Sequence, residues 1–345
     1  MKGSLVFGAT GQMGSYLCEY LLNKGEHVYA VKRRTSTNTE KNLHKCLDHL
    51  NFHLLEGDIT DFSSVWQLCE EAGKYLADFS IYNLAAQSHV HTSFNQPGYT
   101  TDVVYKGVLN ILEWLRIQKR TDVRFCQFCS SEQYGSEQSK GNDEPYQNED
   151  TKMIPNSPYS VAKLAAHNLC KIYRKAYNIF ACCPIIFNTE SPRRGENFVT
   201  QKIVRYVKTL EDYIFESYAQ GVEKEDMPEY LKTYSKLKLG NMSAKRDWNW
   251  VMDTIDGVYR ICNYAKPDDF VLASGNTYSV LEFVDAAFKF IGLNYQDFVH
   301  IDKGLYRPCE VEYLRGRSTK AQKKLGWKPT SNLETLIEKM FHEQA

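Results

Sequence analysis

The chain lacks an excess charge of either sign, a long apolar run and a cysteine framework. Its 345 residues include 42 Lys and Arg, which balance 42 Asp and Glu. Without net positive charge, the chain as a whole does not attract nucleic acid electrostatically. No run approaches the ~18 apolar residues that cross a bilayer, and the apolar start at 4–7 is too short for a signal segment. We therefore expect neither a nucleic-acid nor a membrane partner.

Cysteines are present, but their spacing does not suggest disulfides or a metal site. The ten cysteines are scattered through a chain too large to need disulfides, which predicts a reduced, cytoplasmic protein. Cys126 and Cys129 form a Cys-x-x-Cys pair, and Cys182 and Cys183 are adjacent. Both pairs fall in expected strands, where residues i and i+3 point to opposite faces. No metal is therefore expected.

Short apolar segments alternate with stretches of helical periodicity over the first two-thirds of the chain. The expected strands are 4–7, 27–31, 52–55, 80–84, 124–129 and 180–186, and the clearest helices are 13–23, 62–75 and 103–118. This alternation predicts an α/β fold, a Rossmann-type doubly wound parallel sheet.

The pattern loosens after residue 190. We expect a cofactor-binding domain at 1–190 and, at 191–345, a smaller C-terminal α/β substrate-binding lobe from which some segments return to the core. The clearest helices of the lobe are 279–291 and 332–341. A charged, tyrosine-rich segment at 208–238 is predicted to be a helical insertion.

A glycine-rich turn follows the first expected strand and opens the first expected helix. It reads Gly-Ala-Thr-Gly-Gln-Met-Gly, and its predicted cofactor contacts are Gly8, Gly11, Gln12, Met13 and Gly14. Glycines let backbone N–H groups approach a pyrophosphate at a helix N-terminus. In this strand–turn–helix context the turn predicts dinucleotide binding, whereas an ordinary glycine turn is the alternative.

The end of the second expected strand selects the dinucleotide. NAD enzymes place an acid there, but this chain has Lys-Arg-Arg-Thr-Ser, with Arg33, Arg34 and Ser36 as predicted contacts. Guanidinium groups suit a ribose 2′-phosphate, so we predict NADP, with a solvated basic loop as the alternative. Further along, Asp58 and its neighbour Ile59 are predicted near the adenine, although Asp58 could instead cap the next helix.

Tyr159 and Lys163 are spaced to project from one face of a helix. The ammonium group can lower the pKa of the phenol and hold a nicotinamide ribose, which makes Tyr159 a usable base. Upstream, Ser130 can orient the sugar hydroxyl that Tyr159 deprotonates. The alternative is a surface Tyr/Lys pair.

Glu132 adds a second base beside this pair. Oxidation of a sugar carbon to a ketone acidifies the neighbouring C–H, and a carboxylate there can remove that proton and expel the next hydroxyl. The stored hydride then returns, with no net redox change. A plain dehydrogenase or a 4-epimerase needs no such base, so Glu132 favours a nucleotide-sugar dehydratase over a solvent-facing carboxylate.

These motifs resemble the GDP-mannose 4,6-dehydratase family of extended short-chain dehydrogenases/reductases over nearly the whole chain. Further matching segments are 83–90, 187–195, 197–202, 239–241, 246–248 and 307–310. The resemblance implies that Ser130, Glu132, Tyr159 and Lys163 are catalytic. It also implies cofactor contacts at Leu84, Ala85 and Gln87, and GDP-sugar contacts at Ser88, Asn188, Val199, Lys202, Arg246, Arg307 and Glu310. It further implies a homotetramer or dimer, with the Arg193–Arg194 loop where subunits meet.

Three positions depart from the family pattern. Ser130 stands where the family has Thr, Asn249 and Trp250 replace Gly-His, and the segment 208–238 looks longer than usual. We expect these departures to affect substrate fit more than reaction type. A GDP-heptose therefore remains an alternative substrate to GDP-mannose.

Overall fold

The computed structural model describes residues 1–36, 39–74, 76–139 and 144–342. Within them a parallel sheet runs in the order β12-β7-β5-β4-β1-β2-β3, with β6 also paired to β7. Its strands are β1 (Lys2–Phe7), β2 (His27–Lys32), β3 (Phe52–Glu56), β4 (Asp78–Asn83), β5 (Arg124–Gln127), β6 (Cys129–Ser130), β7 (Phe180–Ile186) and β12 (Asp269–Leu272). The buried, apolar character of these strands is what a sheet covered on both faces requires.

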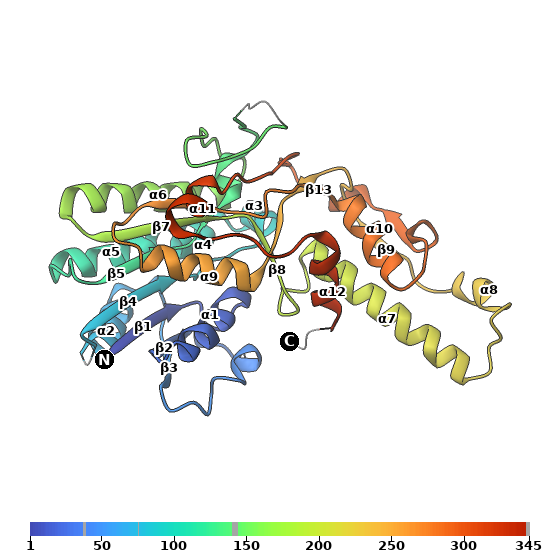
Figure 1. Cartoon of the computed structure of the whole chain (residues 1–345), viewed down its shortest axis with the longest axis horizontal. Coiled ribbons are helices and arrows are strands. Elements are labelled where there is room, and N and C mark those ends of the chain that lie inside the picture. Colours follow the sequence, from blue (N-terminus) through green and yellow to red (C-terminus); the bar gives the residue numbers. More distant parts are fainter. Residues whose placement is uncertain (37–38, 75, 140–143, 343–345) are drawn as a thin grey trace.

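Helices cover both faces of this sheet (Figure 1). One face carries α2 (Phe62–Gly73), α5 (Gly107–Ile117) and α6 (Pro158–Tyr177), and the other carries α1 (Gln12–Asn23) and α9 (Val251–Cys262). The short helices α3 (Val90–Asn95) and α4 (Pro97–Thr101) precede α5, and α11 (Thr319–Leu325) packs near β12. Each face buries its own apolar core.

The strand order places a binding crevice beside β1. From β1 the chain builds outward to β2 and β3 on one side and to β4, β5 and β7 on the other. The loops at the carboxyl ends of β1 and β4 therefore diverge, and this is where doubly wound sheets bind ligands. The predicted α/β fold class is confirmed.

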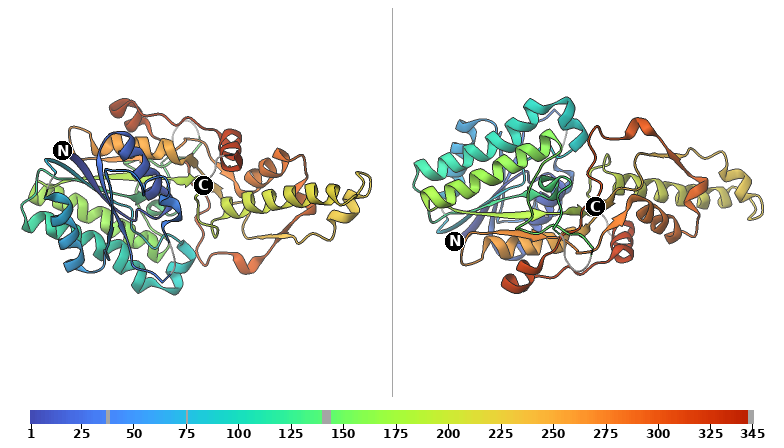
Figure 2. Two further views of the ribbon diagram at one scale, coloured as in Figure 1. Left: turned by 90° about the horizontal axis from the view of Figure 1, so that it is seen from below. Right: turned by 90° about the horizontal axis from the view of Figure 1, so that it is seen from above.

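A smaller group of elements extends away from the sheet, with α7 projecting toward its far tip (Figure 2). It includes α7 (Val199–Ala219), α8 (Met227–Leu231), α10 (Val280–Phe290) and α12 (Leu333–His342), together with β8 (Asn188–Glu190), β9 (Leu237–Leu239), β10 (Lys245–Arg246), β11 (Trp248–Trp250), β13 (Tyr278–Ser279) and β14 (Val299–Ile301). Short pairs join β8 to β11, β9 to β14 and β10 to β13. Between these segments α9 and β12 return to the sheet.

Two expected elements are divided in the structure. The strand expected at 124–129 is interrupted at Phe128, whose carbonyl accepts a hydrogen bond from Lys163 Nζ at 2.7 Å. The helix expected at 103–118 starts with a π-helical turn, Asp102–Lys106, before α5. In the segment 208–238, α7 continues to Ala219, and then α8 and the start of β9 follow, so this segment is only partly helical.

Among the described residues, no helix combines the length and the apolar character that a membrane crossing requires.

Candidate active site

A cavity of about 1220 Å³ opens at the carboxyl edge of the sheet and is lined by residues from both the sheet and the smaller lobe. Single small-ligand pockets usually measure about 300–1000 Å³, so this cavity can hold more than one ligand. It gathers most of the predicted site residues: Gly8, Gly11, Gln12, Met13, Gly14, Arg33, Asp58, Ile59, Leu84, Ala85, Ser88, Ser130, Glu132, Tyr159, Lys163, Asn188 and Arg307.

The glycine turn between β1 and α1 is closely packed. Gly8 has a φ of +80°, which favours glycine, and a Cβ at Gly14 would lie 2.1 Å from the Gly8 carbonyl oxygen. Gly11 caps α1 without a side chain. The turn thus leaves the N-terminus of α1 open to a close ligand, and its dipole favours an anion such as a pyrophosphate.

Arg33 and Asp58 line the cavity at the ends of β2 and β3. Arg33 is exposed, donates to the hydroxyl of Tyr99 and lies 5.9 Å from the centre of that ring. Asp58 Oδ1 accepts hydrogen bonds from Thr60 N and Oγ1 at 2.9 and 2.8 Å. The helix-cap alternative for Asp58 is wrong, because Asp61 caps α2.

The first two turns of α6 present Tyr159 and Lys163 to the cavity. Ser157 caps this helix in a capping box with Ser160, and Pro158 occupies the first turn. The Lys163 ammonium lies 5.9 Å from the centre of the Tyr159 ring and donates to the Phe128 carbonyl. This fixed arrangement is unlike a surface Tyr/Lys pair, since both side chains are buried.

Burial shifts both of these groups toward their neutral forms. It lowers the pKa of Lys163 to about 8. It also raises the pKa of Tyr159 to about 12, and the Glu132 charge adds to this rise, while a hydrogen bond with Ser130 and the charge of Arg194 oppose it. The hydrogen bond with Ser130 and the positive charge of Arg194 therefore make Tyr159 a stronger acid than burial alone would leave it.

Glu132 lies on a tight turn at the end of β6. The Ser130 hydroxyl caps this turn and accepts a hydrogen bond from the Glu132 N–H at 3.3 Å. Gly135 ends it with a φ of +57°, and a Cβ there would lie 1.9 Å from the Ile154 carbonyl oxygen. The turn directs a largely buried carboxylate into the cavity that Tyr159 lines.

A line of alternating charges connects Glu132 to the smaller lobe. Arg307 Nη1 lies 3.8 Å from Glu132 Oε1 and 3.4 Å from Glu310 Oε1. Arg246 Nη2 lies 2.7 Å from the same Glu310 oxygen. Two arginines and a carboxylate of the lobe thus meet the carboxylate of the sheet, which brings four of the predicted residues together.

Other predicted contacts lie outside the cavity lining within the described residues: Arg34, Ser36, Gln87, Val199, Lys202, Arg246 and Glu310. Arg34 lines a shallower hollow shared with Arg33. The Gln87 amide instead bonds the His89 carbonyl and the Thr100 hydroxyl, each at 3.1 Å. Lys202 Nζ donates to the Lys238 carbonyl at 2.7 Å, which ties α7 to β9.

Two of the departures from the family pattern lie in the packing of the protein and not in the cavity. Asn249 and Trp250 are buried, and the Asn249 amide donates to Thr254 Oγ1 at 3.1 Å. Trp250 precedes α9, and Lys339 of α12 lies 5.1 Å from its ring centre. Any effect of these two residues on substrate fit would therefore act through packing.

The sequence reasoning missed several cavity residues of the lobe. Arg194 donates to Gln12 Oε1 at 3.1 Å and lies 3.8 Å from the centre of the Phe198 ring. The α7 residues Gln201, Val204, Arg205 and Lys208 also line the cavity, as do Met340, Phe341 and His342. Their spacing along α7, three and four residues apart, was a readable signal of one helix face.

Comparison with known proteins identifies the family. The family model described as GDP-mannose 4,6 dehydratase matches residues 5–223 and 228–340. The chain belongs to this family. GDP-mannose 4,6 dehydratase 1 of Arabidopsis thaliana is 40% identical over 351 residues, covering 99% of this chain and 89% of the relative. The human GDP-mannose 4,6 dehydratase is 37% identical over 368 residues, covering 98% and 90%.

Solved structures share the fold at lower identity. UDP-glucuronic acid 4-epimerase from Bacillus cereus, in complex with UDP-glucuronic acid and NAD, has a TM-score of 0.79 and 23% identity, and covers 99% of this chain and 98% of its own. The dTDP-glucose 4,6-dehydratase from Bacillus anthracis, in complex with NAD, has a TM-score of 0.77 and 20% identity, with coverage of 99% and 96%. These likenesses support the extended short-chain dehydrogenase/reductase fold.

The family match also corrects the predicted insertion. Within 208–238 only residues 224–227 fall outside the matched ranges. Most of this segment is therefore shared with the family, and it is not an insertion.

Proposed function

We propose that this protein is a hydro-lyase that converts GDP-mannose to GDP-4-keto-6-deoxy-mannose with a bound NADP. The observation that carries this proposal is the position of Glu132, in the same cavity as Tyr159 and Lys163 and linked through Arg307 to the charged pair of the lobe. A dehydrogenase or an epimerase needs the Tyr/Lys pair but has no use for a carboxylate held there. The family membership supports the same reaction.

The residues around the glycine turn fit a dinucleotide. The backbone at Gly14 packs so closely against Gly8 that a side chain there would clash. Arg33 lines the cavity from the end of β2. The cofactor would accept a hydride from C4 of the sugar and return it to C6. Arg33, with Arg34 in the adjoining hollow, supports NADP because guanidinium groups bind a 2′-phosphate by charge-assisted hydrogen bonds.

Each catalytic residue has a distinct task in this proposal. Tyr159 takes the proton of the C4 hydroxyl, Ser130 orients that hydroxyl, and Lys163 stabilises the phenolate. Once C4 is a ketone, Glu132 removes the acidified C5 proton and passes it to the C6 hydroxyl, which leaves as water as the C5–C6 double bond forms.

The lobe arginines support an anionic nucleotide sugar. Arg246 and Arg307 share Glu310, and a diphosphate can displace this shared carboxylate while the carboxylate turns to ribose hydroxyls. Lys202 would need to leave the Lys238 carbonyl to reach the same ligand.

The proposal includes a homo-oligomer, a tetramer or a dimer, and a cytoplasmic location. The resemblance supports the oligomer. All ten cysteines are unpaired, and nine of them are buried, which suits a reducing compartment.

The test is mass spectrometry of GDP-mannose incubated with purified protein and catalytic NADP, without added reductant. Loss of one water establishes the dehydratase and its substrate together. A new isomer of unchanged mass would instead indicate an epimerase. Repeating the reaction with NAD in place of NADP tests the cofactor, and GDP-heptose tests the alternative substrate.

A further inference from the structure

Six buried cysteines form two clusters on opposite faces of the central sheet. Cys126, Cys182 and Cys262 belong to one apolar core, and Cys129, Cys170 and Cys183 belong to the other. This division follows from the alternation of side chains along β5, β6 and β7, and it confirms that the Cys-x-x-Cys pair does not act as a unit. Each of its cysteines meets thiols from distant parts of the chain instead.

Only the cluster beneath α6 contains a histidine among the described residues. One ligand atom each of Cys129, His167 and Cys183 lie within 4.8 Å of one another, and all three side chains are buried. The Cys170 thiol contacts Cys183, as the Cys129 thiol does. The four residues come from β6, α6 and β7, so sequence spacing could not reveal them together.

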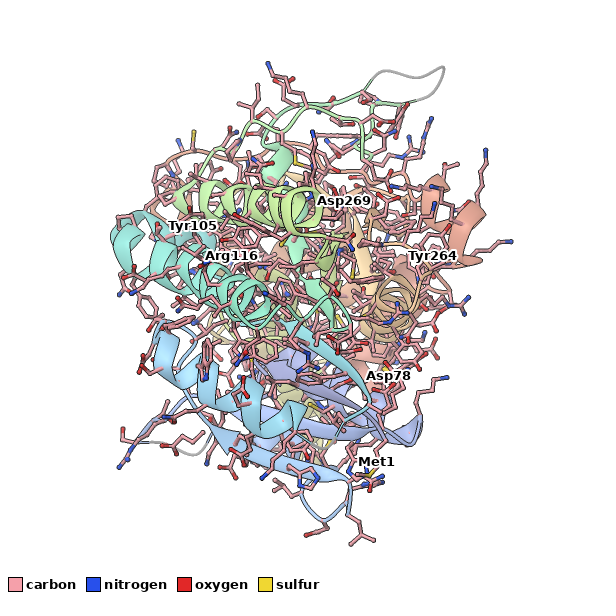
Figure 3. The ribbon with its side chains drawn as sticks, turned by 90° about the vertical axis from the view of Figure 1, so that its left-hand side faces the viewer. Met1, Asp78, Tyr105, Arg116, Tyr264 and Asp269 are labelled. Atoms are coloured by element: carbon pink, nitrogen blue, oxygen red, sulfur yellow. The ribbon has the colours of Figure 1, made fainter. Side chains whose placement is uncertain are left out.

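The imidazole of His167 is oriented as in a metal ligand. Its Nε2 lies 3.0 Å from Asp269 Oδ2, and Asp269 is seen beside α6 in Figure 3. Neither of its buried ring nitrogens has a hydrogen-bond partner among the described residues, since the contact of Nε2 with Asp269 is an ion-pair distance only, and Nδ1 has no such contact. An unpartnered buried nitrogen needs an explanation. Metal-bound histidines commonly donate their other ring N–H to a carboxylate, which leaves the first nitrogen for the metal.

We propose that Cys129, Cys183 and His167 bind one Zn²⁺ ion, with Cys170 as the fourth ligand. Thiolates and an imidazole are the ligand set of structural zinc sites, which are tetrahedral and closed. With Zn–S near about 2.3 Å and Zn–N near about 2.0 Å, ligand atoms around the ion lie just under about 4 Å apart. The three groups that already lie within 4.8 Å of one another need only a small movement, whereas Cys170 must turn toward them from its contact with Cys183. Each thiol releases its proton to solvent as it binds, and the ion enters during folding.

The alternative is that these cysteines are small apolar side chains of the core. The other cluster shows what that looks like: three thiols packed with Tyr82 and no imidazole. The cluster beneath α6 adds a buried imidazole, which faces Asp269 together with Arg174 and Lys171 of that helix. The two clusters therefore differ in the feature that distinguishes a metal site from apolar packing.

The zinc site lies directly beneath the catalytic residues. Cys129 precedes Ser130, and His167 lies one helical turn beyond Lys163 on α6. A bound ion would tie β6, which carries Ser130, to the helix that carries Tyr159 and Lys163. It would act as a structural clamp without touching the reacting atoms.

The experiment measures metal in untagged protein purified from zinc-supplemented cells, by elemental mass spectrometry. We expect one zinc per chain, and stoichiometric loss of it in Cys183→Ser. The matched control is Cys182→Ser, which alters the neighbouring residue of the same strand but faces the other cluster, and it should keep its zinc. Metal-free wild-type protein, or equal loss in both variants, would overturn the proposal.

Cobalt substitution keeps the test decisive if Cys183→Ser fails to fold. Wild-type protein refolded with Co²⁺ should show intense thiolate-to-cobalt charge-transfer bands and the visible bands of tetrahedral cobalt. Cys170→Ser should lower the charge-transfer intensity by about a third, since one of three thiolates is removed. Absence of these bands in the wild type would rule out the site, and unchanged intensity in Cys170→Ser would remove Cys170 as a ligand.

Discussion

The two sides of the cavity hold their charged groups in different ways. On the sheet side, backbone groups position them: Lys163 donates to the Phe128 carbonyl, and Glu132 lies on a turn capped by Ser130. On the lobe side, Arg246 and Arg307 are held by a carboxylate, Glu310. Backbone partners stay in place when ligands come and go, whereas a carboxylate can be exchanged for a phosphate. The sheet side is thus preorganised for chemistry, and the lobe side for ligand exchange.

Glu132→Gln should give the largest effect, because it removes a base from the preorganised side. Loss of a positioned general base lowers rate by about 10²–10⁴-fold. Water elimination should fall by this factor, while oxidation at C4 persists and reduced cofactor accumulates. Absorbance of the reduced cofactor and mass spectrometry of the sugar measure the two steps. Elimination at the wild-type rate would remove Glu132 from the mechanism.

Arg246→Met should act on binding and leave chemistry nearly intact. The change removes one cation from the lobe and leaves Glu310 to Arg307 alone, so KM for the nucleotide sugar should rise by about a hundredfold with kcat within a few-fold. Steady-state kinetics make this distinction. The control is Arg116→Met, since Arg116 pairs with Glu113 on α5, away from the cavity lining. An equal loss in kcat would show that the lobe side is also preorganised for chemistry.

The sheet side of the cavity could be predicted from the sequence more fully than the lobe side. The glycine turn, Tyr159, Lys163 and Glu132 were predictable because each lies in a local pattern at the end of a strand or the start of a helix, and the parallel order of strands brings such ends together. The sheet side was therefore readable from short segments.

The lobe side was less readable because its contacts join distant segments. The pairing of Arg246 with Glu310 spans 64 residues, and Lys202 reaches Lys238 through a fold that no local period describes. The carbonyl of Phe128, where the expected strand is interrupted, likewise bonds a side chain 35 residues away. The sequence showed that Asn249 and Trp250 depart from the family pattern, but only the structure shows that they are buried.

Arg33→Gln should produce a smaller, selective effect on the cofactor. A hydrogen bond to a charged group contributes about 1.5–3 kcal/mol, so NADP affinity should fall by roughly 10- to 150-fold. Affinity for NAD should stay unchanged, because NAD lacks the 2′-phosphate. Equilibrium binding by fluorescence of the reduced cofactors checks this. Equal loss of affinity for both cofactors would show that Arg33 is not a 2′-phosphate contact. Arg34→Gln would then test the adjoining hollow.

Lys163→Met should raise the free energy of unfolding at neutral pH, because it removes a buried ammonium group from the sheet side. Burial lowers the pKa of Lys163 from an ordinary 10.5 to about 8. Below pH 8 both folded and unfolded chains carry the ammonium, so the folded state bears the full penalty of a buried charge. The penalty fades as pH rises from about 8 to 10.5, where only the unfolded chain stays protonated.

Without ligand, Lys163→Met should therefore be more stable than wild type at pH 7. The net gain should be roughly 1 kcal/mol, because the variant also loses the hydrogen bond to Phe128. This advantage should shrink steadily toward pH 10.5. Urea unfolding of both proteins across this range measures it. A difference that stays constant with pH would mean that the buried ammonium is not the source. A difference that fades with rising pH would show that the buried ammonium of Lys163 on the sheet side lowers the stability of the fold. The arginines of the lobe avoid such a cost because they are paired with a carboxylate, Glu310.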